Sequence, residues 1–308
     1  MGEYLLSSGF EYSTVPGYFL QDETSTDYHT FDFSKSNFGL INREYDTDQA
    51  FDPEHEKSQW QRLERKIQSL NEKAAPNTQF KLLFLGRHGQ GYHNVAESIY
   101  GTPAWDTYWS KLDGDGTLYW VDAQLTEEGK NQARLARDTW AAQMKDSIPL
   151  PETYYTSPLD RCLSTATITF GDLDLPPSQP FIPTVKELLR ETIGLHTCDH
   201  RSSKGCIQSA YPSVKFEPGF NTEDPLWTAD ERESKPARDI RLRALLDDIF
   251  THDKNTFISF SSHSGAINSV LNVVGHQRFK LKTGGVIPVL VKAESKEHLR
   301  SSGLSVTN

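Results

Sequence analysis

The residues best suited to chemistry form one short segment, residues 85–94, with the sequence Leu-Gly-Arg-His-Gly-Gln-Gly-Tyr-His-Asn. An apolar run, residues 80–85, precedes it and is typical of a buried strand. Residues 95–100, which follow it, are typical of the start of a helix. A strand that ends in Arg-His-Gly and turns into a helix brings a cation, an imidazole and free backbone N–H groups to one point. These groups could hold a phosphoryl group and attack it.

Three other segments carry polar residues just after an apolar run or at the start of a helical pattern. They are residues 155–166 with Arg161, residues 188–194 with Glu191, and residues 261–265 with His263. The carboxyl ends of parallel strands meet at one edge of a sheet. If the sheet is parallel, that edge holds two arginines, two histidines and one glutamate.

The elements that must position these residues alternate along the chain from residue 80 onward. We expect strands at 80–85, 153–156, 183–187, 257–261 and 286–291, and helices at 126–145, 158–170, 236–251 and 265–274. Alternation of this kind predicts an α/β fold, a three-layer αβα sandwich with a mostly parallel central sheet.

The first 79 residues do not share this alternation and are predicted to form an N-terminal extension that packs on the main domain, residues 80–308. Residues 1–50 are rich in Tyr, Phe, Ser, Thr and Asp and have no sustained period, so we expect irregular structure there. Asp52-Pro53 has the pattern of a helix start. Trp60, Leu63, Ile67 and Leu70 then recur at helical spacing, which predicts one amphipathic helix.

Two long segments inside the main domain also interrupt the alternation. Residues 101–121 are rich in Trp and Tyr, and residues 193–230 are polar and rich in turn-forming residues. Long insertions within a domain are often lids or binding loops, so we expect these two to decide which substrate is accepted.

Composition limits the class of protein. The chain has 308 residues, of which 36% are hydrophobic and 24% charged, and a formal net charge of -10. This charge argues against nucleic acid or an anionic membrane surface as a partner. The three cysteines have no regular spacing, and we find no signal peptide or membrane-spanning run. We therefore expect the protein in a reducing compartment, the cytoplasm, with the nucleus as a second location. The sequence does not indicate an oligomeric state.

Taken together, these segments resemble the histidine phosphatase superfamily, in its phosphoglycerate-mutase-like branch, and in particular fungal mutase-like phosphatases. The resemblance covers about residues 80–292. It depends on the order of the Arg-His-Gly and Ser-His-Ser-Gly segments and on two elements between them, Leu-Thr…Gly at 125–129 and Ser-Pro-Leu…Arg at 157–161.

The resemblance implies a phosphoglycerate-mutase-like fold, a small-molecule phosphate ester as substrate, and no metal or other cofactor. It implies that His88 is a nucleophile that forms a phosphohistidine and that Glu191 is the proton donor. It also implies that Arg87, Arg161 and His263 form the phosphate pocket. Other residues that we expect to bind substrate or phosphate are Asn94, Gln90 and Arg201.

Elementary chemistry supports these roles. A nucleophilic histidine must be neutral, and two flanking guanidinium groups disfavour the imidazolium form of His88 near neutral pH. The same groups present forked N–H donors that match phosphate oxygens. A carboxylic acid can protonate the leaving alkoxide, which is worth about 10²–10⁴-fold in rate.

Several assignments stay open at the level of sequence. Glu187 competes with Glu191 as the acid, and His93 fits a capping or surface role as well as a substrate contact. His196, Cys198, His200 and Cys206 have the residue types of a zinc site, but their spacing does not match the common frameworks. The other hypothesis for this loop is that His196 and Arg201 help to bind substrate.

Two alternatives to a phosphatase remain. A phosphoglycerate-type mutase needs a second phosphate site and typically an Arg-Arg pair after the acid; this chain has Arg190 and Arg201 but no such pair. A non-catalytic phospho-ligand-binding protein would have lost the nucleophile, the acid or the second histidine, whereas all three residue types are present.

Overall fold

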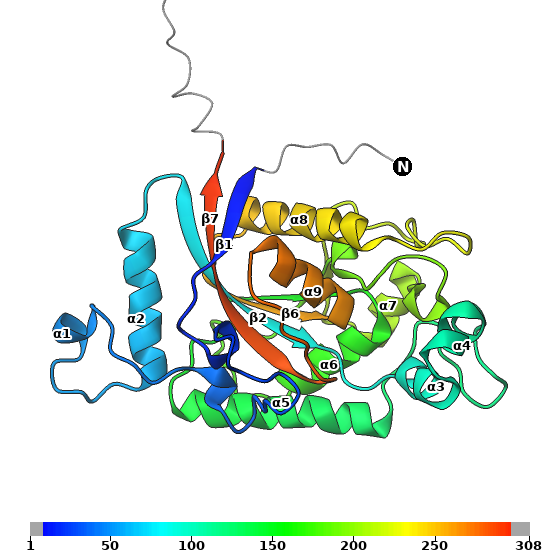
Figure 1. Ribbon diagram of the computed structural model, residues 1–308, viewed down its shortest axis with the longest axis horizontal. Helices are drawn as coiled ribbons and strands as arrows, with labels where there is room; N and C mark the ends of the chain where they lie inside the picture. The colour runs from blue at the N-terminus through cyan, green and yellow to red at the C-terminus, as the bar shows by residue number, and fades with distance from the viewer. Residues whose placement is uncertain (1–8, 297–308) are drawn as a thin grey trace, which may run out of the picture.

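A seven-stranded sheet runs through the computed structural model, which describes residues 9–296 (Figure 1). The strand order is β1-β7-β2-β6-β3-β4-β5. The parallel strands are β2 (Thr78–Arg87), β6 (Phe257–Ser262), β3 (Thr153–Thr156), β4 (Thr184–Val185) and β5 (Lys215–Phe216). β7 (Val286–Ser295) runs antiparallel to β2 and to the edge strand β1 (Phe10–Thr14). The sheet is therefore mostly parallel, as predicted.

Helices cover both faces of this sheet. α8 (Lys235–His252) and α9 (Ser264–Val273) lie on one face. α2 (Gln59–Glu72), α5 (Glu127–Lys145) and α6 (Asp160–Phe170) lie on the other (Figure 1). Alternate residues of β2 supply the two cores, because successive side chains of a strand point to opposite faces. Leu83 packs with the α8–α9 side, and Phe84 packs with Trp60 and Trp140 on the α2–α5 side. The three-layer αβα prediction is confirmed.

The two long segments contain regular structure that the sequence pattern did not predict. Residues 101–121 include α4 (Thr102–Thr107) and a 3₁₀ turn at Trp109–Lys111, which follow α3 (Tyr92–Tyr100). Residues 193–230 include a 3₁₀ turn at Thr197–Asp199, then α7 (Lys204–Ala210) and β5. β5 pairs with β4, so part of the expected loop extends the sheet. The remaining short elements are α1 (Asp48–Phe51) and 3₁₀ turns at Leu20–Asp22, Asn37–Gly39 and Glu187–Leu189.

The predicted helix start at Asp52-Pro53 is wrong. α2 begins at Gln59, after the cap Ser58, whose side chain accepts a hydrogen bond from the backbone N–H of Gln61. Asp52 ends α1 instead, and its carboxylate accepts the backbone N–H groups of Glu56 and Lys57. A carboxylate that captures nearby N–H groups stabilises a turn as readily as a helix start.

The N-terminal segment is joined to the sheet and is less irregular than its composition predicted. β1 forms five paired positions with β7, and its buried Phe10 and Tyr12 belong to the core beneath α8. Phe19 and Phe38 are fully buried on the opposite face with Trp60. In residues 9–296, no helix has both the length and the apolar composition needed to cross a bilayer.

Candidate active site

The carboxyl ends of two neighbouring parallel strands bring two histidines together. β2 and β6 pair with Arg87 opposite Ser262, so His88 and His263 each follow directly after a strand. The backbone N–H of His88 donates to the carbonyl of Ser262 at 2.9 Å, and the two imidazole rings lie 5.1 Å apart between centroids. The expected convergence of the Arg-His-Gly and Ser-His-Ser-Gly segments is therefore present.

His88 has one ring nitrogen available for attack. Its side chain is almost completely buried, and Nδ1 lies 2.7 Å from the carbonyl oxygen of Gly89. Because a carbonyl oxygen only accepts hydrogen bonds, Nδ1 carries the proton and Nε2 carries the lone pair. Burial, together with the positive charges of Arg161 and Arg87, holds the pKa of His88 well below its usual value. The ring is thus neutral near neutral pH, with the Nε2 lone pair available.

Arg161 faces this histidine from the first turn of α6. Its Nη1 donates to the carbonyl of Cys198 at 2.5 Å, and its Nη2 donates to Oδ1 of Asp199 at 2.8 Å. Burial alone would raise the pKa of Asp199, but Arg232 and Arg161 hold that pKa below its usual value. Asp199 is therefore an anion that fixes the orientation of the Arg161 guanidinium.

Two buried N–H donors at this point have no partner. The Nε–H groups of Arg87 and Arg161 are both buried, and neither donates a hydrogen bond to another group within residues 9–296. Arg87 is held through Nη1, which donates to the carbonyl of Leu281 at 2.8 Å. Buried donors are normally hydrogen-bonded. Both guanidinium groups line the same cavity as the neutral imidazole of His88, and this combination fits an anion such as a phosphoryl group.

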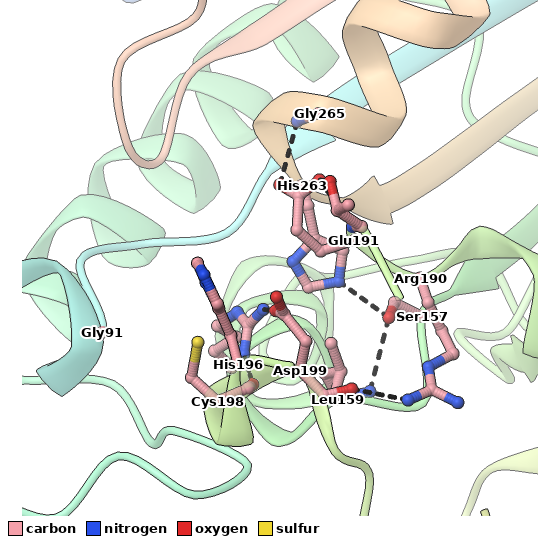
Figure 2. Close-up of polar contacts among 12 residues, drawn as sticks. Gly91, Ser157, Leu159, Arg190, Glu191, His196, Cys198, Asp199, His263 and Gly265 are labelled. Carbon is pink, nitrogen blue, oxygen red and sulfur yellow. Dashed lines mark hydrogen bonds and ion pairs between the residues drawn. The ribbon is translucent and has the colours of Figure 1, made fainter. Parts of the chain in front are cut away.

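His263 is fully buried and is held in place by neighbours from α6 and the preceding turn. Its Nε2 lies 2.8 Å from Oγ of Ser157 and 3.3 Å from Sγ of Cys162, and Figure 2 shows the ring directed at Ser157. Burial and the charge of Arg161 hold the pKa of His263 well below its usual value. The second histidine is therefore also neutral in the unliganded protein.

Glu191 reaches the cavity from the loop after β4. Its Oε2 accepts the backbone N–H of Gly265 at 2.9 Å, in the first turn of α9 (Figure 2). Its Oε1 accepts the backbone N–H of Thr192 at 3.0 Å and lies 3.9 Å from Nη1 of Arg238. A side chain at position 265 would collide with this carboxylate. The glycine at this position therefore allows the acid to lie against α9.

Glu187, the competing acid in the sequence, lies elsewhere. Its carboxylate is paired with Arg190 at 3.0 Å and with Arg201 at 2.9 Å, and it is not among the residues that line the cavity with His88. The geometry favours Glu191 over Glu187.

These side chains surround a cavity of about 290 Å³. Its lining includes Arg87, His88, Arg161 and Glu191, and His263 lies behind it. Asn94 also lines the cavity, although its side chain accepts the backbone N–H of Gly91 at 3.0 Å and so caps α3. His93, which the sequence left open, lines the same cavity with its ring centroid 5.4 Å from that of His88.

Two residues expected to bind substrate are not brought to this cavity. The Gln90 side chain accepts a hydrogen bond from Thr126 at 2.8 Å, which ties the nucleophile loop to the start of α5. The Arg201 guanidinium is buried, is paired with Glu187 and donates to the carbonyls of Asn221 and Glu223. Arg201 cannot contact a group at His88 from this position, so the expectation for Arg201 is wrong in this structure. A sequence pattern does not show which acid an arginine will meet in an irregular loop.

Sequence reasoning also missed three residues of the cavity wall. Asp199, Arg232 and Arg238 line the cavity, and Asp199 bridges Arg161 and Arg232. Asp199 and Arg232 lie in or next to the irregular segment 193–230, where no periodic pattern indicates which side chains turn inward. Arg238 lies in α8, whose helical pattern does not indicate that this residue faces a cavity. Residues 193–230 hold a single arginine, Arg201, so their composition gave no signal either.

The four residues with the residue types of a zinc site, His196, Cys198, His200 and Cys206, do not come together in the structure. His196 and Cys198 lie close together with Asp199, their ligand atoms within 4.8 Å of one another, but His200 stacks on Trp227 and Cys206 is exposed. Both carboxylate oxygens of Asp199 already accept hydrogen bonds from arginines. Burial raises the pKa of the Cys198 thiol well above its usual value. This donor set therefore fits an arginine-orienting role better than a metal site.

The fold and the cavity define an α/β protein with a site of arginine, histidine and carboxylate side chains at the carboxyl edge of its parallel strands. The family model described as histidine phosphatase superfamily (branch 1) matches residues 107–281. The chain belongs to the histidine phosphatase superfamily. The match begins after Arg87-His88-Gly89, so the family model does not cover this segment.

Two relatives illustrate the similarity. A protein of Arthroderma benhamiae named "Probable phosphoglycerate mutase" is 63% identical over 96% of this chain and 88% of its own length. "Phosphomutase-like protein 3" of Candida albicans is 39% identical over 70% of this chain and 66% of its own length.

Solved structures give weaker matches. The ecdysone phosphate phosphatase of Bombix mori, solved with tungstate, is 18% identical, covers 66% of this chain and 80% of its own, and has a TM-score of 0.42. A mycobacterial glucosyl-3-phosphoglycerate phosphatase is 21% identical, covers 65% of this chain and 84% of its own, and has a TM-score of 0.39.

Proposed function

We propose that this protein is a phosphatase that hydrolyses a small-molecule phosphate ester through a covalent phosphohistidine on His88, without a metal ion. The observation that carries the proposal is the neutral, Nδ1-protonated His88, which lines one cavity together with the guanidinium groups of Arg87 and Arg161. A neutral imidazole supplies the lone pair, and the guanidinium groups stabilise the charge on the transferred phosphoryl group.

In the first step, Nε2 of His88 attacks phosphorus, the P–N bond forms and the ester P–O bond breaks. The Gly89 carbonyl stabilises the positive charge that develops on the ring, because it accepts the hydrogen bond from Nδ1. Glu191, which lines the same cavity, donates a proton to the leaving alkoxide. In the second step, water attacks phosphorus and gives its proton to the Glu191 carboxylate, while the P–N bond breaks and free phosphate forms.

The experiment that tests this proposal is hydrolysis of p-nitrophenyl phosphate by the wild-type protein and by His88→Ala. We expect wild-type activity that persists after exhaustive treatment with EDTA, and a stable phosphorylated species when the reaction is quenched under alkaline conditions. The variant should show neither product nor phosphorylated protein. Retained activity in His88→Ala, or complete loss of wild-type activity in EDTA, would contradict the mechanism.

A second candidate function is a phosphoglycerate-type mutase. The name of the Arthroderma benhamiae relative, which is 63% identical, favours it. The chain has no Arg-Arg pair after Glu191, which argues against it. Incubation with 3-phosphoglycerate, followed by phosphorus NMR, separates the two candidates. A phosphatase releases inorganic phosphate, and a mutase forms 2-phosphoglycerate.

A further inference from the structure

A second cavity, of about 340 Å³, adjoins the catalytic cavity. The two share Arg238 and Asn268 as lining residues, so they lie next to each other at these two side chains. The second cavity lies over α8 and α9, which pack side by side (Figure 1), and we name it the α8–α9 groove. Its polar lining consists of Lys235, Arg238, Asn268, Asn272, His276 and Arg278.

The α8–α9 groove is positively charged, in a protein whose formal net charge is -10. Lys235, Arg238 and Arg278 line it, and no carboxylate does so among the residues that the structure describes. Lys235 and Arg278 are exposed. Arg238 donates through Nε to Ser269 and through Nη1 to Thr192, which leaves its Nη2 free for a ligand. A local cluster of cations against an opposing overall charge indicates an anion-binding surface.

Glu191, in the adjoining catalytic cavity, lies 3.9 Å from Nη1 of Arg238 and partly offsets its charge. Two other nearby acids have partners of their own. Oδ1 of Asp22 lies 3.2 Å from Nε2 of His276. Oδ2 of Asp239 accepts a hydrogen bond from the side chain of Asn272 at 2.8 Å. Neither carboxylate lines the groove, so neither cancels the charge of Lys235 or Arg278 there.

The opposite wall of the catalytic cavity has the opposite charge. Glu97 of α3 and Asp106 of α4 both line it. A leaving group with its own negative charge is repelled by these carboxylates and attracted toward the α8–α9 groove. The direction in which an anionic leaving group extends is therefore fixed by charge.

α9 gives the length of this path. Gly265 lines the catalytic cavity and Asn272 lines the α8–α9 groove, and both belong to α9. At 1.5 Å per residue, they are separated by about 10 Å along the helix. We propose that the substrate is an elongated phosphate ester whose leaving group carries a second phosphate, bound by Lys235, Arg238 and Arg278 in the α8–α9 groove. This proposal rests on the proposed function, since it assumes that the transferred phosphate lies at His88.

The test compares three probes: hexanediol bisphosphate, hexanediol monophosphate and ethanediol bisphosphate. Binding to His88→Ala is measured by calorimetry at low ionic strength, so that the result does not depend on turnover. Three cations should favour hexanediol bisphosphate over the monophosphate by about tenfold. Ethanediol bisphosphate is too short to span the two cavities and should gain less.

Variants then locate the effect. In the His88→Ala background, the double substitution Lys235→Ala and Arg278→Ala should reduce the ratio of bisphosphate to monophosphate affinity to within about twofold of one. The double substitution Arg134→Ala and Lys145→Ala, an equal loss of exposed charge on α5 across the sheet, should leave the ratio unchanged. A ratio near one in the parent, an unchanged ratio in the double variant, or equal gains for both bisphosphates would overturn the proposal. If the ratio is as expected but the wild-type protein hydrolyses none of the probes, the proposed function is wrong and the subsite stands.

Discussion

Gly89 and Gly129 lie in direct contact, and this contact holds the carbonyl group that orients His88. A Cβ at position 129 would lie 2.8 Å from the backbone nitrogen of Gln90, and a Cβ at position 89 would lie 2.8 Å from the carbonyl carbon of Gly129. The Gly89 carbonyl is the acceptor for Nδ1 of His88. The start of α5 therefore supports the nucleophile from behind, although it contributes no side chain to the reaction.

The first prediction follows from this contact. Gly129→Ala should push the 89–91 loop away from α5 and lower kcat for p-nitrophenyl phosphate by about 100-fold, because a shift of about 1 Å in a reacting group can have that effect. The control is Gly205→Ala in α7, where an added Cβ meets nothing closer than 4.0 Å. That variant should keep full activity and gain about 0.5–1 kcal/mol in stability. Equal kcat values for the two variants would show that the contact does not orient His88.

A second prediction separates the two candidate acids. Glu191→Gln should lower kcat for an alkyl phosphate by about 10²–10⁴-fold, and by less for p-nitrophenyl phosphate, whose leaving group needs little protonation. Glu187→Gln should act on stability instead, because it weakens the pairing with buried Arg190 and Arg201. The measurements are kcat with both substrates and the midpoint of thermal unfolding. The assignment fails if the leaving-group dependence appears in the Glu187 variant.

Asp199 provides a third prediction. Asp199→Asn removes the anion between Arg161 and Arg232, so KM should rise, together with the inhibition constant for inorganic phosphate, and breaking a buried pair should cost about 3–5 kcal/mol of stability. Asp48→Asn is the matched control, since Asp48 is buried and pairs with Arg62 at 2.9 Å far from the cavity. The control should lose stability and keep its KM. An unchanged KM in Asp199→Asn would argue against an orienting role for Asp199.

The fourth prediction concerns pH. Burial and the charge of Arg161 hold the pKa values of His88, His93 and His263 well below that of an unfolded histidine, about 6.5. Below about pH 6.5 the unfolded chain therefore binds protons that the folded protein does not. The free energy of unfolding should be independent of these groups above that pH and should fall on acidification, by up to about 4 kcal/mol per pH unit for three protons.

Urea unfolding between about pH 7 and 5 checks this dependence. His93→Gln should reduce the slope by one proton. A free energy of unfolding that stays flat across this range would show that these histidines do titrate in the folded protein.

Much of the fold could be predicted because long periodic segments specify their own structure. The strand at 153–156 has the predicted bounds, and the helix expected at 236–251 is α8 with bounds that differ by one residue. The sequence pattern did not predict β1 and β5. Each is a short strand at an edge of the sheet and is not buried on both faces, so its residues do not form a continuous apolar run.

The residues of the candidate site also fall into two groups, those in periodic segments and those in irregular segments. His88, Arg161 and His263 each follow a strand or begin a helix, so parallel-strand topology was enough to bring them together. Arg201, Asp199 and Arg232 belong to an irregular segment, where partner choice depends on tertiary packing. The sequence assigned the pocket role to Arg201, whereas the structure has Arg232 and Asp199 there.

β2 lies inside the sheet, between β7 and β6, and this position has a consequence for synthesis of the chain. β2 is complete at residue 87, but both strands that pair with it come late: β6 begins at Phe257 and β7 at Val286. At ~5–20 residues per second, a ribosome takes on the order of ten seconds or more to supply them. During that time an apolar strand with two unpaired edges has no native partner, which is a hazard for aggregation. We therefore expect the nascent chain to depend on a chaperone until its last third emerges, and the phosphate site to form only at the end of folding.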